Sequence, residues 1–298
     1  MSEKVCVIVN PASGRGRGAR ALDAIRMAFE NVGVKDIRLT QQIEGERAVA
    51  KKAIEDGCTT IVACGGDGTW GNVANAILNS GADVRLALLA AGTGNDFAKT
   101  VGAPAKDFAA TAALAVNGPD LRVDVGKIEN QFFLNIAGFG FDIAVLEDIP
   151  KIPLLRGDAV YLVSALRQLI GYGGIDIDIA TAARARGNAR HLMLVIANAR
   201  NFGGMFKIAP SASLTDGKLD AIDILDASAL RRMALFAAAV KGTHVAAAEV
   251  ISEQASSFTL KFPNAPAYET DGEYRKASSA ELEVSCVPRA LRVVTNSE

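Results

Sequence analysis

A glycine-rich segment, GGDGT from Gly65 to Thr69, follows an apolar run and precedes a helix-like pattern. Glycine lets the chain turn sharply and lets another molecule approach the backbone N–H groups, while a helix that begins there adds its positive dipole end. These features suit a phosphate. The carboxylate of Asp67 would repel phosphates unless a cation or hydrogen-bond donors lie between them, which favours a metal-bound nucleotide. The alternative is a tight strand-to-helix turn without a ligand.

A second glycine-rich turn, NPASGRGRGA, follows the first apolar run of the chain. Gly14 and Gly16 begin a G-x-G-x-x-A spacing, which is typical of dinucleotide-binding turns. A dehydrogenase would also need an acidic residue about 20 positions later to hold a ribose hydroxyl, but Thr40 stands there. We therefore do not expect a dehydrogenase. Arg15 and Arg17 could reach phosphate oxygens, or they are solvated loop arginines.

A third turn, GTGND from Gly92, repeats the pattern and places Asn95 and Asp96 where a helix would begin. An Asn-Asp pair at that point could also act only as a helix N-cap. Three such turns at the ends of adjacent strands would bring their N–H groups to one crevice. The sequence has no G-x-x-x-x-G-K-[ST] string, which excludes a P-loop enzyme.

Two turns in the second half of the chain carry oxygen ligands and carboxylates. In PSASLTDGKLD, Ser213, Asp216 and the Lys218 carbonyl have a spacing that suits Mg²⁺ or Ca²⁺. An unliganded hairpin turn would explain this segment equally well. In AYETDGEYR, Asp271 and Glu273 flank a glycine, and either could act as a general base near a metal-bound phosphate. Solvated turns of this kind are common.

The elements around these motifs change in character along the chain. Apolar strands alternate with helical patterns up to about residue 124, which predicts a Rossmann-like α/β nucleotide-binding domain with ligands at the carboxyl ends of parallel strands. From 125 to 287 the strands look short and paired, which predicts an antiparallel β-sandwich domain. We interpret IDIDIA and KLDAIDIL as half-buried strands with Asp on one face. The last apolar strand, within 288–298, is expected to return to the first domain.

The composition indicates a globular protein. Of 298 residues, 50% are hydrophobic and 22% are charged, and a net charge of −1 gives no general attraction to nucleic acid or anionic membranes. No apolar run reaches the roughly 18 residues of a membrane-spanning helix, and the chain enters a strand almost at once, so we expect a cytoplasmic protein. The four cysteines form no CxxC pair. Buried reduced thiols are expected in preference to disulfides or a zinc site.

Together these motifs resemble the bacterial diacylglycerol kinase and lipid kinase family, whose catalytic domain is shared with eukaryotic diacylglycerol and sphingosine kinases. GGDGT alone also occurs in NAD kinases and phosphofructokinases, whereas the other segments are more specific. The matching segments follow the family order over nearly the whole chain: NPASGRG from Asn10, GGDGT from Gly65, GTGNDFA from Gly92, DVG at Asp124, PSASLTDGKLD from Pro210 and DGE from Asp271.

The resemblance implies ATP-dependent phosphorylation of a lipid hydroxyl, with Mg²⁺ as a second cofactor and the nucleotide bound between the domains. It implies a structural Mg²⁺ site at Ser213, Asp216 and the Lys218 carbonyl, although relatives often carry Asp where Ser213 stands. The general base maps to Asp271, with Glu273 as the alternative. Asp96 and Asp124, with Asp67 and Asn95, resemble a polar network behind a catalytic Mg²⁺. The implied nucleotide contacts are Asn10, Pro11, Ser13, Gly14, Arg15, Thr40, Gly65, Gly66, Asp67, Gly68, Thr69, Gly71, Thr93, Gly94 and Asn95.

The expected partner is a lipid substrate, met at the membrane surface by a peripherally bound protein, with no nucleic acid involved; a homodimer is left open. Apolar residues beside Lys151, Arg156 and Arg167 could line an acyl groove or touch a bilayer, although core packing explains them equally well. Two alternative functions remain. One is a soluble-substrate kinase similar to NAD kinases, and the other is a lipid-binding protein on the same scaffold without catalysis.

Overall fold

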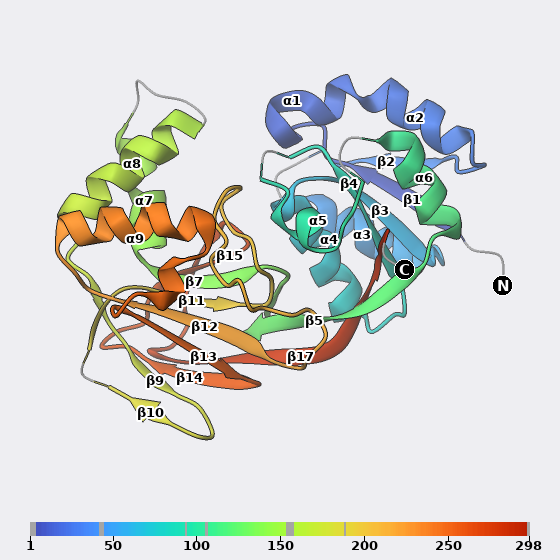
Figure 1. The fold of residues 1–298 in the computed structure, drawn as a ribbon. Helices are drawn as coiled ribbons and strands as arrows, with labels where there is room; N and C mark the ends of the chain where they lie inside the picture. Colours follow the sequence, from blue (N-terminus) through green and yellow to red (C-terminus); the bar gives the residue numbers. More distant parts are fainter. Residues whose placement is uncertain are drawn as a thin grey trace. The chain divides into compact units, whose positions relative to one another are not determined.

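A computed structural model describes residues 4–41, 45–92, 94–104, 107–152, 158–187 and 189–296. The chain divides into two compact units, one made of 1–125 with 287–298 and the other of 126–286. Two strands, β5 (Asp120–Ile128) and β17 (Glu281–Val294), each have residues in both units. Figure 1 shows the course of the chain through both units.

The first unit is built on a parallel sheet. Buried residues, mainly Val, Ile, Leu, Ala and Cys, make up its strands β1, β3 and β4, as expected where helices cover both faces. Strand β2 is only partly buried. The end of β17 adds to this sheet in parallel, with Arg292 opposite Arg85. The other strands lie in the order β4-β3-β1-β2, with the bounds β1 (Val5–Val9), β2 (Asp36–Leu39), β3 (Thr60–Gly65) and β4 (Arg85–Ala90).

Helices pack on both faces of this sheet (Figure 1). Ile25 and Phe29 of α2 join one face of β1 and β3 in a buried core that also includes α6. The segment that forms α1 was expected to be a turn. It is helical instead, but the helix is interrupted where Gly14, Arg15 and Gly16 adopt positive φ. The helices are α1 (Ser13–Arg20), α2 (Leu22–Glu30), α3 (Gly45–Glu55), α4 (Asp67–Ser80), α5 (Asp96–Thr100) and α6 (Phe108–Asn117).

The second unit is built from antiparallel strands. One sheet has the order β13-β12-β11-β7-β15-β16 with β8 beside β11, and β10, β9, β14 and β17 pair in that order in the other. The strands are β6 (Gln131–Phe133), β7 (Ile136–Gly140), β8 (Ile175–Asp176), β9 (Asp178–Ala180), β10 (Ala185–Arg186), β11 (Arg190–Ala197), β12 (Leu219–Leu225), β13 (Val250–Ala255), β14 (Ser257–Lys261), β15 (Ala267–Thr270) and β16 (Glu273–Lys276).

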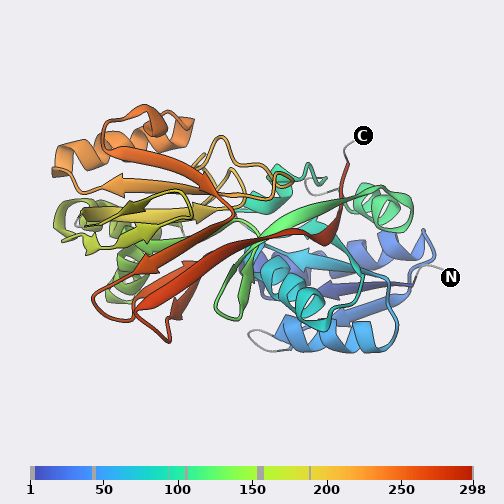
Figure 2. The same ribbon diagram turned by 90° about the horizontal axis from the view of Figure 1, so that it is seen from below.

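Three layers make up the second unit. Phe139, Leu194 and Phe258 belong to an apolar core shared by the two sheets, and Val195 and Leu235 belong to a second core under the helices. Helix α9, the sheet with β12 and β13, and the strands β14 and β17 follow one another in Figure 2. The predicted α/β and antiparallel classes are confirmed. The helical segments are α7 (Phe141–Asp148), η1 (Ile149–Lys151), α8 (Asp158–Gly171), α9 (Ala229–Lys241) and η2 (His244–Ala246).

The interpretation of KLDAIDIL as a half-buried strand is wrong. Six consecutive residues of β12, from Leu219 to Ile224, are buried. Asp220 and Asp223 are three residues apart, so they point to opposite faces of the sheet. Both carboxylates are buried with partners: Asp220 accepts hydrogen bonds from Ser211 and Gln254, and Asp223 from Arg186. Because both faces are covered, this strand lacks the exposed face that its two Asp residues suggested.

None of the described helices combines the length and the apolarity that crossing a membrane requires. All four cysteines are free thiols, and Cys6, Cys58 and Cys64 are buried.

Candidate active site

The first unit brings its three glycine-rich turns together at the carboxyl ends of β1, β3 and β4. A Cβ atom on Gly14 would lie 2.0 Å from the Ala91 carbonyl oxygen, and one on Gly92 would lie 2.5 Å from the Cα of Gly66. The Gly65 carbonyl accepts hydrogen bonds from the N–H groups of Ala91 and Gly92 at 2.7 and 2.9 Å. Glycine is therefore required here because the backbones of the turns touch.

A buried carboxylate that the sequence analysis missed connects two of these turns. Glu46, at the start of α3, accepts hydrogen bonds from the Asn10 amide at 2.7 Å and from the Thr69 hydroxyl at 3.3 Å. Asn10 also donates to Thr69 at 3.2 Å. Glu46 is 4% exposed, and its other oxygen has no hydrogen-bond partner among the described residues. In the sequence, Glu46 is a single Glu at the polar start of a helix, and nothing in that pattern indicates this role.

Asp67 does not stand unpaired beside the glycine turns. Its two oxygens accept hydrogen bonds from the N–H groups of Asp96 and Phe97 at 3.1 and 3.0 Å, at the start of α5. The carboxylate of Asp67 therefore caps the N-terminus of α5. Asn95 occupies the N-cap position in a left-handed conformation without making a cap bond, and Asp96 forms an ion pair with Lys99 at 2.9 Å.

The remaining predicted contacts of the first unit lie in and around these turns. The Ser13 hydroxyl is buried without a hydrogen-bond partner in the described ranges, Arg15 is exposed, and Thr40 is buried at the end of β2. Asp124 is fully buried and accepts a hydrogen bond from the N–H of Arg289 at 2.7 Å.

Thr93 lies outside the described residues. Pro11 precedes α1, Gly68 and Gly71 lie in α4, and Gly94 precedes α5.

In the second unit, Ser213, Asp216 and Lys218 share one turn before β12. The Asp216 carboxylate accepts a hydrogen bond from the Lys218 N–H at 3.0 Å, and the Ser213 hydroxyl lies 3.4 Å from the Thr215 nitrogen. Asp216 and Lys218 are exposed. The turn therefore offers hard oxygen donors to solvent, and this donor set fits Mg²⁺ or Ca²⁺.

Asp271 lies in the two-residue hairpin between β15 and β16. Asp271 and Gly272 both have positive φ, of 52° and 88°, as a type I′ turn requires. The Asp271 carboxylate accepts hydrogen bonds from the N–H groups of Leu134, Asn135 and Ile136 at 2.8, 2.7 and 3.1 Å. These bonds fix the carboxylate and use three of its roughly four acceptor positions. Asp271 therefore has a structural task besides any catalytic one.

Glu273, the alternative general base, begins β16 and forms an ion pair with Arg275 at 3.0 Å. Arg275 also donates to the Thr270 hydroxyl at 2.8 Å, so this ion pair is part of the hairpin. The general base and the metal ligands stay predictions, because the geometry shows their positions and not their chemistry.

A pair of buried carboxylates beside this hairpin was not predicted. Asp142, on α7, and Glu269, on β15, are 8% and 1% exposed, and both approach Gly138. Burial raises the pKa of Asp142 to about 6. Burial first, and then repulsion from Asp142, raises the pKa of Glu269 well above its ordinary value. Neither residue lies in a recognisable motif, and only the packing of α7 against β15 brings them together.

Comparison with known proteins identifies the family. Residues 4–128 match the model of the diacylglycerol kinase catalytic domain, and residues 135–295 match the model of the YegS C-terminal NAD kinase beta sandwich-like domain. The chain belongs to the bacterial diacylglycerol kinase and lipid kinase family. The resemblance carried by the sequence motifs is thereby confirmed.

Relatives in this family match over most of their length. The chain is 28% identical to a diacylglycerol kinase of Mycobacterium tuberculosis (strain CDC 1551 / Oshkosh), covering 98% of this chain and 94% of the relative. It is 27% identical to a diacylglycerol kinase of Bacillus subtilis (strain 168), covering 90% and 89%.

Solved structures show the same fold. A crystal structure of a diacylglycerol kinase from Bacillus anthracis str. Sterne superposes with a TM-score of 0.78 at 22% identity, over 99% of this chain and 97% of that one. An NAD kinase from Archaeoglobus fulgidus, solved in complex with ATP, gives a TM-score of 0.55 at 14% identity, over 98% and 94%.

The contact between the glycine turns of this family member can be tested by adding one methyl group. Gly14→Ala should lower the free energy of unfolding more than Gly33→Ala does. Both glycines have positive φ, so both variants carry a left-handed strain of about 1 kcal/mol. Only Gly14 would also clash with backbone, since Gly33 has open space. Urea denaturation measures the difference, and equal losses would contradict the contact.

The buried pair should make stability depend on pH. A carboxyl group whose pKa is raised on folding stabilises the fold below its unfolded pKa, and this contribution is lost as the pH rises through the folded value. The melting temperature should therefore fall between about pH 4 and pH 7, and Glu269→Gln should flatten this fall. Glu281→Gln, which changes an exposed carboxylate paired with Lys261, serves as the control. An unchanged slope in Glu269→Gln would contradict the coupling.

Proposed function

We propose that this protein is an ATP- and Mg²⁺-dependent kinase that transfers the γ-phosphoryl group to a lipid hydroxyl, of diacylglycerol or a related lipid. The observation that carries the proposal is the meeting of three glycine turns at the carboxyl ends of β1, β3 and β4. Ligands bind at this edge in open parallel sheets. Family membership and the names of the relatives support the choice of a kinase over other nucleotide-binding proteins.

The turns of the first unit provide what phosphoryl transfer needs most, which is positioning and neutralisation of phosphate charge. Backbone N–H groups in the glycine turns are suited to phosphate oxygens, and the exposed Arg15 adds a positive charge beside them. Glu46 and Asp67 hold the turns in position through hydrogen bonds from Asn10 and from the start of α5. These roles follow the nucleotide contacts predicted from the motifs.

The second unit supplies the metal turn and the general base in this proposal. Ser213, Asp216 and the Lys218 carbonyl would hold a structural Mg²⁺ ion in the turn before β12. Asp271 would accept the proton of the attacking lipid hydroxyl, because its carboxylate is already fixed by three N–H groups. Glu273 is the alternative, although its ion pair with Arg275 ties it to the hairpin.

The activity is tested with labelled ATP, Mg²⁺ and mixed micelles of diacylglycerol, phosphatidylglycerol, a sphingoid base or a polyprenol. Asp271→Asn should lower the transfer rate about 10²- to 10⁴-fold, as expected when a general base is lost. Because Asp271 also holds residues 134–136, the melting temperature of the Asp271→Asn protein must be measured alongside its activity. Glu273→Gln is the matched variant and should retain more activity. A folded Asp271→Asn protein with full activity would overturn its assignment.

The NAD kinase-like fold favours one alternative acceptor, so soluble NAD belongs in the same assay. Label transferred to NAD and to none of the lipids would show that NAD, and not a lipid, is the acceptor. Lipid binding without transfer to any acceptor would instead support the non-catalytic function.

We propose further that the second unit meets the lipid at a bilayer surface, through exposed apolar residues on α8 and α9. On α8, Leu162, Leu166 and Ile170 recur every four residues, which puts them on one face of the helix, with exposed fractions of 54%, 44% and 71%. On α9, Leu230 is 77% exposed and Met233 is 38% exposed. The segment around Arg156, also predicted to touch lipid, lies outside the described residues.

The charge of these helices suits an anionic bilayer. Helix α9, ALRRMALFAAAVK, has no acidic residue, and its exposed cations are Arg231, which pairs with Glu249, and Lys241. Its third cation, Arg232, is buried and pairs with Asp226. Its neighbour α8 carries Arg167, which is 55% exposed and pairs with Asp148. The two helices are in contact, since Arg232 of α9 donates to the Leu169 carbonyl at 3.2 Å. An apolar face flanked by cations is typical of helices that lie in the membrane interface.

Sedimentation with vesicles tests this surface. Binding to phosphatidylglycerol vesicles should exceed binding to phosphatidylcholine vesicles and should weaken with salt. The double variant Leu166→Ser/Leu230→Ser should reduce binding several-fold. Met27→Ser is the control, because Met27 is 63% exposed on α2 of the other unit. Equal binding by all three proteins would contradict a docking role for α8 and α9.

A further inference from the structure

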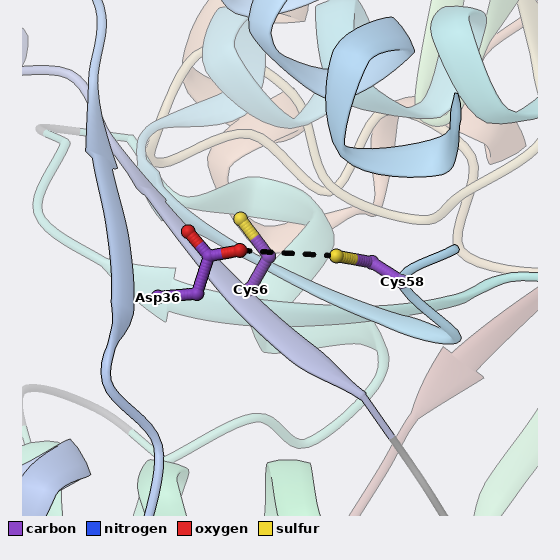
Figure 3. A group of neighbouring side chains, drawn as sticks. All are labelled: Cys6, Asp36 and Cys58. Atoms are coloured by element: carbon purple, nitrogen blue, oxygen red, sulfur yellow. Dashed lines mark hydrogen bonds between the residues drawn. The ribbon is translucent and has the colours of Figure 1, made fainter. Parts of the chain in front are cut away.

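Two thiols and a carboxylate lie together at the opposite end of the parallel sheet from the glycine turns. Cys6 of β1 and Asp36 of β2 are register partners on adjacent strands, and Cys58 comes from the segment between α3 and β3. Their sulfur and oxygen ligand atoms all lie within 4.8 Å of one another (Figure 3). In the part of the chain that the structure describes, no other three His, Cys, Asp or Glu residues come together in this way.

The surroundings hold the carboxylate of this cluster in place. Arg38 lies two residues after Asp36, on the same face of β2, and donates to both Asp36 oxygens at 2.9 and 2.7 Å. Arg38 also pairs with Asp56 at 3.0 Å, and Asp56 pairs with Lys52 at 2.9 Å. The Cys58 thiol lies 4.0 Å from an Asp36 oxygen. Hydrogen-bonded partners behind a ligating group are typical of metal sites, because they fix its orientation.

We propose that Cys6, Cys58 and Asp36 form a binding site for a thiophilic divalent cation, with Zn²⁺ as the expected ion. Thiolate sulfurs bind Zn²⁺ at about 2.3 Å and carboxylate oxygens at about 2.0–2.2 Å, so the three ligand atoms need only a small contraction around the ion. Three protein ligands leave the fourth tetrahedral position to water. Asp36, whose side chain is 32% exposed, gives the cluster a route to solvent.

The charges balance when the ion is bound. Each thiol loses its proton and forms a metal–sulfur bond, so one M²⁺ ion replaces two H⁺ ions and the charge of the cluster does not change. Two thiolates and Asp36 then carry three negative charges, and the ion with Arg38 carries three positive charges. Burial raises the pKa of Cys6 to about 12 and also raises that of Cys58, so the ion must displace firmly held protons. A cation with high thiolate affinity can do so, whereas Mg²⁺ prefers oxygen ligands.

This site is separate from the proposed kinase chemistry. Cys6 is near the start of β1 and Asn10 follows its end, so the two lie about 13 Å apart along the strand at about 3.3 Å per residue. The ligands also differ from the oxygen donors of the Ser213 turn. The site can therefore be tested by metal binding alone, whatever the activity of the protein proves to be.

Titration of the reduced, metal-free protein with Cd²⁺ tests the proposal directly. A thiolate-to-metal charge-transfer band should grow and saturate at one equivalent, and Zn²⁺ should displace it. Zn²⁺ should also raise the melting temperature, because an ion that binds only the folded state stabilises it. Cys58→Ala should abolish the band. Cys64→Ala should keep it, since Cys64 is a buried thiol of β3 that belongs to the core on the α2 side of the sheet.

Asp36→Asn keeps both thiols and provides a second variant if Cys58→Ala does not fold. It should weaken Cd²⁺ binding at least tenfold while leaving a thiolate band at high Cd²⁺. The proposal is overturned if the wild-type protein shows no saturable band, if Cys58→Ala binds Cd²⁺ as well as wild type does, or if Asp36→Asn leaves the affinity unchanged.

Discussion

The direct backbone contact between glycine turns is the constraint on which the candidate active site depends. Gly14 lies against the Ala91 carbonyl and Gly66 lies against Gly92, so any side chain at these positions would push the turns apart. The turns end parallel strands of one sheet, and the sheet register fixes where each of them starts. Backbone N–H groups can converge on a phosphate only because no side chains separate the turns.

Buried polar groups then fix what glycine leaves flexible. Glycine has more backbone freedom than any other residue, so turns rich in it need additional restraints. Glu46 supplies one by accepting hydrogen bonds from Asn10 and Thr69, and Asp67 supplies another by capping α5. Both oxygens of Asp67 and one oxygen of Glu46 accept hydrogen bonds from protein donors. Their negative charge is thereby accommodated close to turns that we propose to bind phosphate.

The second unit uses the same principle around Asp271. The type I′ hairpin places its carboxylate against three consecutive N–H groups, which ties β15 to the segment before β7. The Asp142–Glu269 pair is buried beside it with raised pKa values. Such a pair costs stability at neutral pH, because two carboxylates close together in a dry environment cannot both ionise readily. Residues that destabilise a fold in this way are often found near functional sites.

The sequence by itself determined the fold class, the family and the positions of the glycine turns, because hydrophobic periodicity and turn chemistry are local properties. Only the tertiary structure decided what depends on contacts distant in the chain. It showed that Glu46 holds Asn10, that both faces of β12 are covered, and that Asp142 lies beside Glu269. Cys6, Asp36 and Cys58 form no sequence motif, and strand register alone brings the first two together. Spacing along the chain cannot reveal such a cluster, because its members come from separate elements.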